Sequence, residues 1–302
     1  MTNSSAFFLI VLLLLLCTCS PSETDESATL SWESVQDSTM RVQSISGFDG
    51  PEAVRYDPDQ DVYFVSNFNG GGNDRDDNGY ISKLLPDGTI ESQQFMTGTE
   101  DHPLHAPRGM YITGDTLWAA DVDGVHGFNR TTGEQVQFID FTELEPGFLN
   151  DIAATPDGTL YVTDTGTSTL YRIDNTTPSV VHDDLPHAPN GITLDPDSGR
   201  LILAPWGGAL TFHAWDPETE ELTDFASAQS GGNMDGIEFY NGRLLAASQV
   251  DSSLHVILDD EDLVHITMPG RPADIGLDTQ RNQVAVPYIA LNRVDIWQLP
   301  EE

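Results

Sequence analysis

The sequence predicts an all-β protein, a six-bladed β-propeller in which a strand from the N-terminal side closes blade 6. Three observations lead to this fold class: six segments share one strand–turn–strand pattern, each has room for four strands, and no segment reads as a credible helix. A propeller blade is a four-stranded sheet of roughly 40 to 45 residues, and the repeats match that length.

The six repeats each combine an opening residue, usually Pro or Leu, with a polar residue, a short apolar strand, a turn rich in Asp, Asn and Gly, and an aliphatic strand. The opening positions are 51, 107, 149, 189, 234 and 272, so the spacings are 56, 42, 40, 45 and 38 residues. A third alternating strand follows in every repeat, and a fourth in the first five. Because the sixth repeat ends after its third strand, we expect residues 40–46 to supply the missing outer strand and remove the exposed edge.

The segment ahead of the repeats is expected to be an export signal followed by a tether. Residues 1–19 contain an apolar run that is too short to span a bilayer as a mature helix. The run ends in Leu-Cys-Thr-Cys, which is similar to a bacterial lipobox and predicts lipidation at Cys19; simple cleavage is the alternative. Residues 20–38 read as a flexible acidic tether, and residues 39–300 as a single propeller domain. We therefore expect an exported protein, lipid-anchored at the cell envelope or free in the periplasm or outside the cell.

The charge balance excludes several partners. The chain has 12 Lys and Arg against 49 Asp and Glu, a formal net charge of −37, and Lys83 is its one lysine. Nucleic-acid binding needs clustered cations, so no nucleic-acid partner is expected, and a membrane is contacted only through the lipid anchor. So acidic a composition is typical of proteins that work in concentrated salt, where screening mutes the repulsion; an ordinary acidic secreted protein is the alternative. We expect a monomer.

The polar position that opens each repeat predicts a metal site. In a propeller the first strand of each blade lines the central channel, so these positions converge on one end of the axis. Four of the six are oxygen donors, with no thiol or imidazole, which favours a hard divalent cation, Ca²⁺ first. In chain order the six residues are Glu52, Arg108, Asn150, Asn190, Asp235 and Ala273.

Residues 46–300 resemble the regucalcin–gluconolactonase family of six-bladed propellers, which is also named after the senescence marker protein. The phrases that carry the resemblance are GPE in the first repeat, LND and PDGTLYVTD in the third, PNG in the fourth and MDG in the fifth. In that family such motifs hold a divalent metal at which lactones are hydrolysed. The resemblance therefore implies four metal ligands, namely Glu52, Asn150, Asn190 and Asp235.

The chain departs from the family pattern at two places. Asp49 competes with Glu52 as the first ligand, because family members often read Glu-Gly-Pro where this chain reads Asp-Gly-Pro-Glu. Phe148 occupies a position where sugar-lactone enzymes of the family often carry Arg, which speaks against a polyhydroxylated sugar lactone. Arg108, from the second repeat, is a candidate for the missing positive group, and an Arg that merely braces carboxylates is the alternative.

Residues around the metal face are candidates for substrate contact or for support of the ligands. If the first strand of a blade starts at this face, the second strand ends there, one strand further out. That places Asn67, Asp121, Asp164 and Ser248 near the rim, as turn caps or as contacts to ligands and substrate. His102, His105 and His187 precede first strands and are candidate proton carriers or plain loop residues. The acidic loop 69–79 is expected to overhang the same face; its D-x-D-x-N-G pattern lacks the final Glu of an EF-hand.

These observations favour a metal-dependent hydrolase of a small lactone or ester. The metal would polarise the carbonyl group, and Asp235 is the candidate that orients or deprotonates the attacking water. The alternative is a non-catalytic propeller in which a structural metal supports a face that binds a partner or glycan.

Overall fold

The structure is a computed structural model that describes residues 1, 32, 40–258 and 261–301. The predicted signal segment, Cys19 and the predicted tether lie outside the described residues, with the exception of Met1 and Trp32. Within the described part of the chain, no helix has the length and apolar character needed to cross a membrane.

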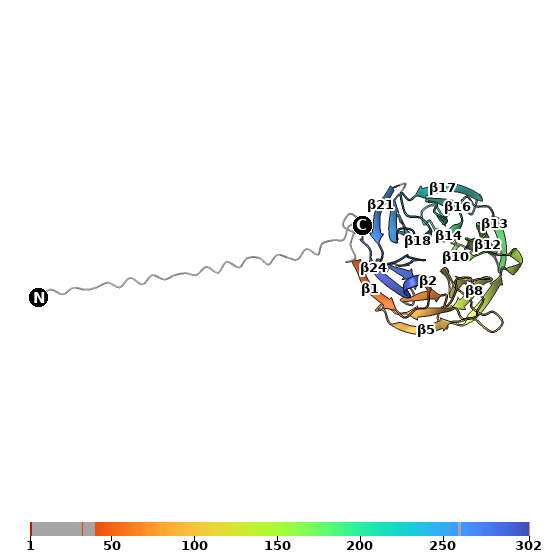
Figure 1. Cartoon of the computed structure of the whole chain (residues 1–302), viewed down its shortest axis with the longest axis horizontal. Helices are drawn as coiled ribbons and strands as arrows, with labels where there is room; N and C mark the ends of the chain where they lie inside the picture. Colours follow the sequence, from red (N-terminus) through yellow and green to blue (C-terminus); the bar gives the residue numbers. More distant parts are fainter. Residues whose placement is uncertain (2–31, 33–39, 259–260, 302) are drawn as a thin grey trace.

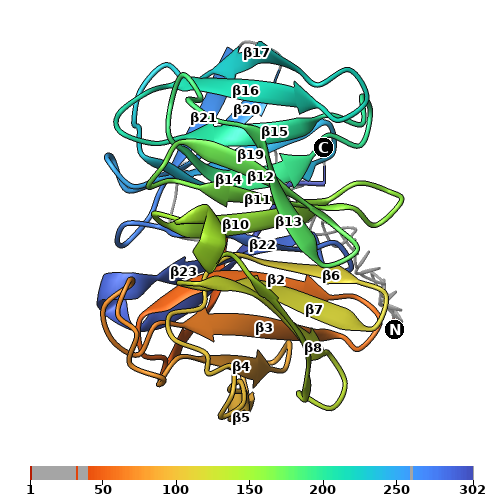
Figure 2. The same cartoon turned by 90° about the vertical axis from the view of Figure 1, so that its right-hand side faces the viewer.

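The described residues form six four-stranded antiparallel sheets arranged as blades around a central axis (Figure 1), which Figure 2 shows edge-on. The all-β, six-bladed prediction is therefore confirmed. The strands of blades 1 to 3 are β2 (Pro51–Asp57), β3 (Val62–Asn67), β4 (Tyr80–Leu84), β5 (Ile90–Met96), β6 (Met110–Thr113), β7 (Thr116–Ala120), β8 (Gly124–Asn129), β9 (Gln135–Asp140), β10 (Leu149–Ala154), β11 (Leu160–Asp164), β12 (Thr169–Asp174) and β13 (Thr177–His182). Those of blades 4 to 6 are β14 (Pro189–Leu194), β15 (Leu201–Pro205), β16 (Thr211–Asp216), β17 (Glu221–Ser227), β18 (Met234–Tyr240), β19 (Arg243–Ser248), β20 (Ser253–Leu258), β21 (Glu261–Thr267), β22 (Gly276–Asp278), β23 (Gln283–Tyr288), β24 (Arg293–Gln298) and β1 (Arg41–Ser46).

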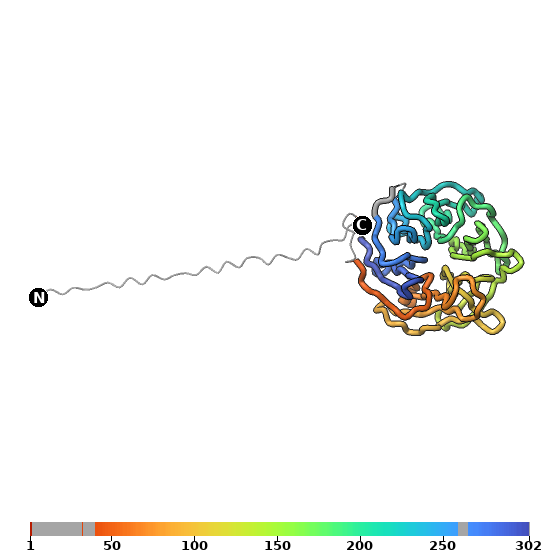
Figure 3. The backbone as a smooth tube through the Cα atoms, viewed as in Figure 1, coloured from red at the N-terminus to blue at the C-terminus, as the bar shows by residue number. Residues whose placement is uncertain are grey.

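Blade 6 combines the two ends of the propeller in one sheet. Its strand order is β1-β24-β23-β22, so β1 is the outer strand, as predicted. The two strands run antiparallel, with Ile45 opposite Val294 and Ser46 opposite Arg293. Figure 3 shows this closure as the place where the orange-red start of the described chain lies beside its blue end. Main-chain hydrogen bonds therefore complete the ring and leave β24 without an open edge.

The hydrophobic core lies between the blades rather than at the axis. Six clusters of buried side chains each join two neighbouring blades, because alternate residues of every strand face opposite sides of its sheet. Between blades 5 and 6, for example, Leu245 packs with Val284 and Trp297. Trp32 joins this cluster edge-on against Tyr240, with ring centroids 6.2 Å apart, so this one described residue of the predicted tether is docked on the propeller.

Candidate metal centre on the propeller axis

The inner strands of blades 1, 3, 4 and 5 are irregular at the positions that the sequence singles out. In each of them the pairing with the second strand shifts register by one residue, as it does at a β-bulge. A bulge bends the strand and re-aims a side chain. The shifts span the four predicted ligands, falling between Pro51 and Val54, Leu149 and Ile152, Pro189 and Ile192, and Met234 and Ile237.

Each of the four predicted ligands buries an oxygen atom that has no hydrogen-bond partner within the part of the chain that the structure describes. None of these side chains is more than 3 % exposed. An unpaired buried oxygen is costly, so native proteins pair such atoms or use them to bind ions. The four atoms are Glu52 Oε2, Asn150 Oδ1, Asn190 Oδ1 and Asp235 Oδ1. A set of two carboxylates and two amide oxygens fits a hard cation such as Ca²⁺.

Hydrogen bonds from neighbouring blades hold the main chain of three ligands in place. The carbonyl of Glu52 accepts from the backbone N–H of Asp274 at 2.9 Å. The carbonyl of Asn150 accepts from the backbone N–H of Gly109 at 2.9 Å, and that of Asn190 accepts from the Thr163 hydroxyl at 2.6 Å. The donors come from blades 6, 2 and 3 respectively, so closure of the propeller also positions the main chain of these predicted ligands.

The carboxylates of the predicted ligands Glu52 and Asp235 lie in an environment that disfavours their negative charge. Burial, with the nearby charge of Asp235, raises the pKa of Glu52 well above its ordinary value. Burial also raises the pKa of Asp235 to about 7, although the amide of Gln249 donates to its Oδ2 at 2.5 Å and works the other way. A bound cation would relieve this strain, since an opposite charge stabilises the ionised form.

Two further buried carboxylates, Asp151 and Asp274, lie next to the predicted ligands and were missed by the sequence reasoning. Their exposed fractions are 1 % and 2 %, and burial raises the pKa of Asp151 to about 7. The signal was available one position further along each repeat, where the residues are Ala, Gly, Asp, Gly, Gly and Asp. A Cβ at Gly109 would lie 2.1 Å from Asp151 Oδ1, and one at Gly236 would lie 2.3 Å from Asp274 Oδ1. The glycines therefore make room for the aspartates of the next blade.

Arg108 places its guanidinium against Phe148, the position where sugar-lactone enzymes of the resembling family often carry Arg. Its guanidinium lies 3.8 Å from the ring centroid of Phe148, a cation–π contact. It donates to the carbonyl of Leu149 at 2.8 Å, to the carbonyl of Gly72, and to Asn73 Oδ1 at 3.2 Å. The side chain is fully buried, and burial lowers the pKa of Arg108 to about 10.

The acidic loop 69–79 reaches from blade 1 across to blade 2. Besides the contacts of Gly72 and Asn73 with Arg108, Asp77 Oδ1 lies 3.0 Å from His105 Nδ1, and the backbone N–H of Gly79 donates to the carbonyl of Leu104 at 3.0 Å. The loop thus covers Arg108 beside the ligand ring, at the end of the axis where the sequence places it.

The predicted residues at the ends of the second strands bind the loops that precede the first strands. Asp121 accepts from the backbone N–H groups of His105 at 2.7 Å and Ala106 at 2.6 Å. Asp164 accepts from four backbone N–H groups, including those of Gly147 and Phe148, each at 2.8 Å. Asn67 and Ser248 do the same in blades 1 and 5. These residues therefore fix the loops that lead into the strands of the predicted ligands. Contact between them and a substrate remains a prediction.

The remaining candidates lie away from the ring. Asp49 is exposed and accepts a hydrogen bond from the Tyr80 hydroxyl at 2.6 Å, so the geometry favours Glu52 as the blade 1 ligand. His105 lies between Asp77 and Asp123. His102 stacks on Phe138 with a centroid distance of 4.4 Å, and His187 lies edge-on to His213 at 5.4 Å. The structure records no hydrogen bond or ion pair from these three histidines to a ring ligand, within the residues it describes.

An ion pair spans the channel three residues further along the inner strands of blades 1 and 5 than Glu52 and Asp235. Arg55 Nη1 lies 2.5 Å from Glu238 Oε1, which joins blade 1 to blade 5. Hollows also lie between turns of neighbouring blades; one between blades 3 and 4 has a volume of about 720 Å³ and is lined by turn residues such as Asp157 and Pro217.

The comparisons with known proteins bear on the fold. The sequence matches no protein-family model and no curated protein. Similar solved structures include a gluconolactonase from Xanthomonas campestris, with 16% sequence identity, a TM-score of 0.65, and coverage of 85% of this chain and 88% of that chain. A calcium-binding protein, regucalcin, from Agrobacterium tumefaciens has 16% identity, a TM-score of 0.63, and coverage of 85% and 93%. Virginiamycin B lyase from Staphylococcus aureus has 13% identity, a TM-score of 0.60, and coverage of 85% and 98%. The resemblance to gluconolactonase and regucalcin is confirmed as a likeness of fold.

Proposed function

We propose that the protein is a divalent-metal-dependent hydrolase of a small lactone or ester, with the ion held by the four-oxygen ring on the axis. The observation that carries this proposal is the set of four buried oxygens without a hydrogen-bond partner, one from each of blades 1, 3, 4 and 5. Hard oxygens select Ca²⁺, Mg²⁺ or Mn²⁺ over softer ions. The ring ligands are Glu52, Asn150, Asn190 and Asp235.

The chemistry divides between the ion and the protein. When bound, a hard cation polarises the carbonyl of the substrate and stabilises the oxyanion that develops there. We assign to Asp235 the orientation and deprotonation of the attacking water. Gln249 fixes the carboxylate through Oδ2 and leaves Oδ1 without a protein partner. A bound cation stabilises the ionised carboxylate, which is the form of Asp235 that can accept a proton from water.

Lactone hydrolysis is supported by the likeness to a gluconolactonase, but the same fold also occurs in a lyase, which cleaves without adding water. The fold alone therefore does not indicate which reaction the protein catalyses. The argument for hydrolysis must come from the residues at the axis. Hydrolysis needs a group that activates the carbonyl and a group that deprotonates water. In this proposal an ion held by the ring of oxygen donors has the first role, and the carboxylate of Asp235 has the second.

A non-catalytic propeller is the second candidate, and the burial of Arg108 favours it. The guanidinium of Arg108 already donates hydrogen bonds to the loop residues Gly72 and Asn73. A substrate would therefore reach Arg108 only if loop 69–79 moved. In this alternative the ion would be structural and the loop-covered face would bind a partner or glycan.

A hydrolysis assay on a panel of lactones and esters, with chelator and with Ca²⁺ restored, separates the two candidates. The proposal expects activity that chelator abolishes and Ca²⁺ restores, and that Asp235→Asn loses. Asp195→Asn is the matched control, because Asp195 is a buried carboxylate directly after the inner strand of blade 4, at the opposite end of the axis. Asp164→Ala is not neutral, since that carboxylate binds four backbone N–H groups. If Ca²⁺ raises the melting temperature but no substrate is turned over, the non-catalytic alternative holds.

We also propose that the chain is exported, anchored through a lipid on Cys19, and acts as a monomer in a saline environment. The support is the apolar run before Cys19 and the net charge of −37. Replacement of Cys19 by Ser should release the protein from the membrane fraction of the expressing bacterium. Retention in that fraction would refute the anchor.

A further inference from the structure

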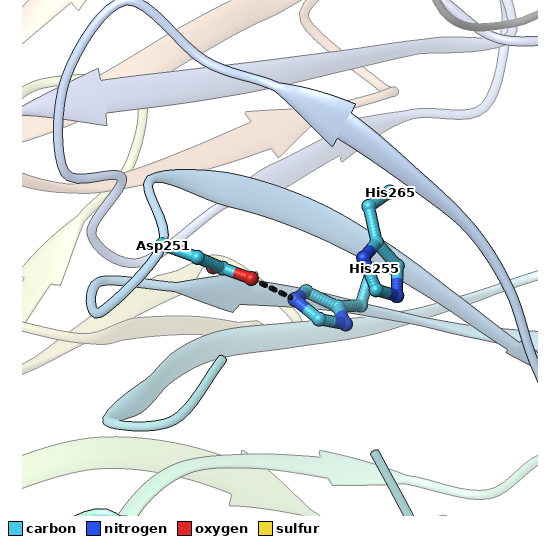
Figure 4. A group of neighbouring side chains, drawn as sticks. All are labelled: Asp251, His255 and His265. Atoms are coloured by element: carbon cyan, nitrogen blue, oxygen red, sulfur yellow. Dashed lines mark hydrogen bonds and ion pairs between the residues drawn. The ribbon is translucent and has the colours of Figure 1, made fainter. Parts of the chain in front are cut away.

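Three side chains of types that ligate metals, Asp251, His255 and His265, lie together on blade 5. Strands β20 (Ser253–Leu258) and β21 (Glu261–Thr267) pair antiparallel, with His255 directly opposite His265. Their rings lie 4.0 Å apart between centroids, at an angle of 36°. Figure 4 shows the two imidazoles side by side, with Asp251 approaching from the loop that precedes β20.

Asp251 completes a compact group of three. Its Oδ2 lies 3.1 Å from His255 Nε2, and its Oδ1 accepts a hydrogen bond from the Ser253 hydroxyl at 2.7 Å, which orients the carboxylate. One donor atom from each of Asp251, His255 and His265 lies within 4.8 Å of the other two. Ligands of a tetrahedral Zn²⁺ bind at about 2.0 to 2.2 Å, so their donor atoms are about 3.4 Å apart. Small rotations of the side chains therefore suffice to close the group on an ion.

A glycine packs directly beside two of the donor atoms. Gly231 has a φ of +79°, and a Cβ built there would lie 2.4 Å from Ser248 Oγ, 2.9 Å from His255 Nε2 and 3.1 Å from Asp251 Oδ2. Any larger residue at this position would press on the two donor atoms. His255 is buried, whereas Asp251 and His265 are exposed. An ion can therefore enter from solvent and bind against a rigid inner ligand.

We propose that Asp251, His255 and His265 form a second metal site, selective for a borderline divalent cation of the Zn²⁺ class. Two imidazole nitrogens and one carboxylate suit Zn²⁺, whereas the axial ring offers oxygens alone and suits harder ions. Three protein ligands leave a coordination position for water. The two sites therefore differ in ligand chemistry as well as in place, and each can be filled separately.

The proposed site is linked to the axial ring through a short stretch of chain. Gln249, which donates to Asp235 Oδ2 at 2.5 Å, precedes Asp251 by two residues in the same loop. An ion held by Asp251 and by both strands of the β20–β21 hairpin fixes this loop. An ion in the blade 5 site should accordingly restrict the movement of Gln249 and of the Asp235 carboxylate to which Gln249 donates.

Metal titration of the untagged, metal-stripped full chain tests the proposal. The axial ring is first saturated with excess Ca²⁺, and Zn²⁺ is then added and followed by calorimetry, with Co²⁺ as a visible-absorption probe of four-coordinate geometry. We expect one Zn²⁺ per chain. His265→Ala should weaken binding by more than about tenfold, since loss of even an outer-shell partner costs that much. Asp251→Asn, which is nearly isosteric, should weaken it as well.

Two further variants locate the ion. His182→Ala removes another histidine from an outer strand, β13, and should leave Zn²⁺ binding within about twofold of the unchanged chain. Asp235→Asn alters the axial ring, which Gln249 links to the same loop, and should weaken Zn²⁺ binding far less than the blade 5 variants do. Circular dichroism in chelator checks that His265→Ala folds, and Asp251→Asn serves if it does not. The proposal is overturned if the Ca²⁺-saturated protein binds no Zn²⁺, if both blade 5 variants bind it normally, or if Asp235→Asn abolishes the binding.

Discussion

The side-chain amide of Asn150 donates a hydrogen bond to the hydroxyl of Thr165 at 3.0 Å, and that hydroxyl donates its own proton to the carbonyl of Pro189 at 2.7 Å. A hydroxyl has one proton to give, so Thr165 can only accept from Asn150. The nitrogen of the amide must therefore face Thr165, and Oδ1 is the atom left for the axis.

Replacement of Thr165 by Val should weaken Ca²⁺ binding by about 10- to 100-fold, the usual cost of losing a partner that orients a ligand. The shape of the side chain is kept, but the amide of Asn150 is no longer fixed. Calorimetric titration measures the change, and Thr165→Ser, which keeps the hydroxyl, should bind Ca²⁺ nearly as the unchanged chain does. Equal affinity of the Val and Ser variants would contradict the assignment of Asn150 as a ligand.

Removal of β1 should open the ring. A chain that lacks residues 1–47 leaves β24 as an unpaired edge, removes Ile45 from the cluster between blades 6 and 1, and exposes what remains of it, including Phe48. We expect aggregation and loss of a single cooperative melting transition. A chain that lacks only residues 1–30 keeps β1 and should melt cooperatively. A soluble, cooperatively melting protein without residues 1–47 would show that β1 is dispensable for closure.

The stability of the metal-free protein should increase as the pH is lowered from about 8 to about 5.5. Burial raises the pKa of Asp235 and of Asp151 to about 7, whereas unfolded carboxyls titrate near 4. Between these values the folded state binds more protons than the unfolded state, so the free energy of unfolding rises as pH falls.

Urea unfolding with chelator present measures this slope, and Asp235→Asn should make it smaller. Saturating Ca²⁺ should flatten or reverse it, because protons then displace a stabilising ligand. At about a hundredfold excess over its dissociation constant, the ion should add about 2.7 kcal/mol to the free energy of unfolding. A metal-free protein whose stability falls steadily from pH 8 to pH 5.5 would contradict the prediction.

The ion pair between Arg55 and Glu238 should matter most when only one partner is lost. Their side chains are 15% and 14% exposed, so Glu238→Leu leaves a poorly solvated charge on Arg55. We expect a loss of about 3 kcal/mol in the free energy of unfolding. The double variant Arg55→Met with Glu238→Leu should recover most of it, and the double-mutant cycle gives the coupling. Additive single effects would show that the pair acts as two independent side chains.

The melting temperature should rise with salt. The formal net charge of −37 makes the compact state repel itself, and a change from about 0.1 M to about 2 M NaCl screens that repulsion by shortening the Debye length to a few Å. Differential scanning calorimetry of the Ca²⁺-loaded protein measures the effect, with KCl as a check on ion type. A flat or falling melting temperature would leave the acidic composition without this explanation.

The sequence predicts the ring well because its information is local and repeated. Each turn and each alternating strand recurs at a spacing that a blade explains, and the shortage of one strand after residue 298 predicts the pairing of β1 with β24. The polar position that opens each repeat, which includes Glu52 and Asp235, predicts which side chains lie at one end of the axis. The role of these residues as metal ligands remains a prediction.

What the repeats do not reveal depends on contacts between blades. The bulges that re-aim the inner strands leave no pattern of their own in the sequence. The placement of Asp151 depends on a glycine in blade 2, and that of Arg108 on the ring of Phe148 in blade 3. Such pairs are 40 or more residues apart and come together only when neighbouring sheets pack at a fixed angle.

The pairing of β1 with β24 also constrains the order of events during synthesis. Arg41 and Asp295, which approach to 3.4 Å, are 254 positions apart in the chain. The first strand to emerge must therefore wait, unpaired, until nearly the whole polypeptide has followed it, and so distant a contact closes slowly. Once it is made, the two ends of the propeller are neighbours. A circular permutant that joins them and is cut at an exposed turn elsewhere, such as that around Gly242, should keep the ring while changing which blade is completed last.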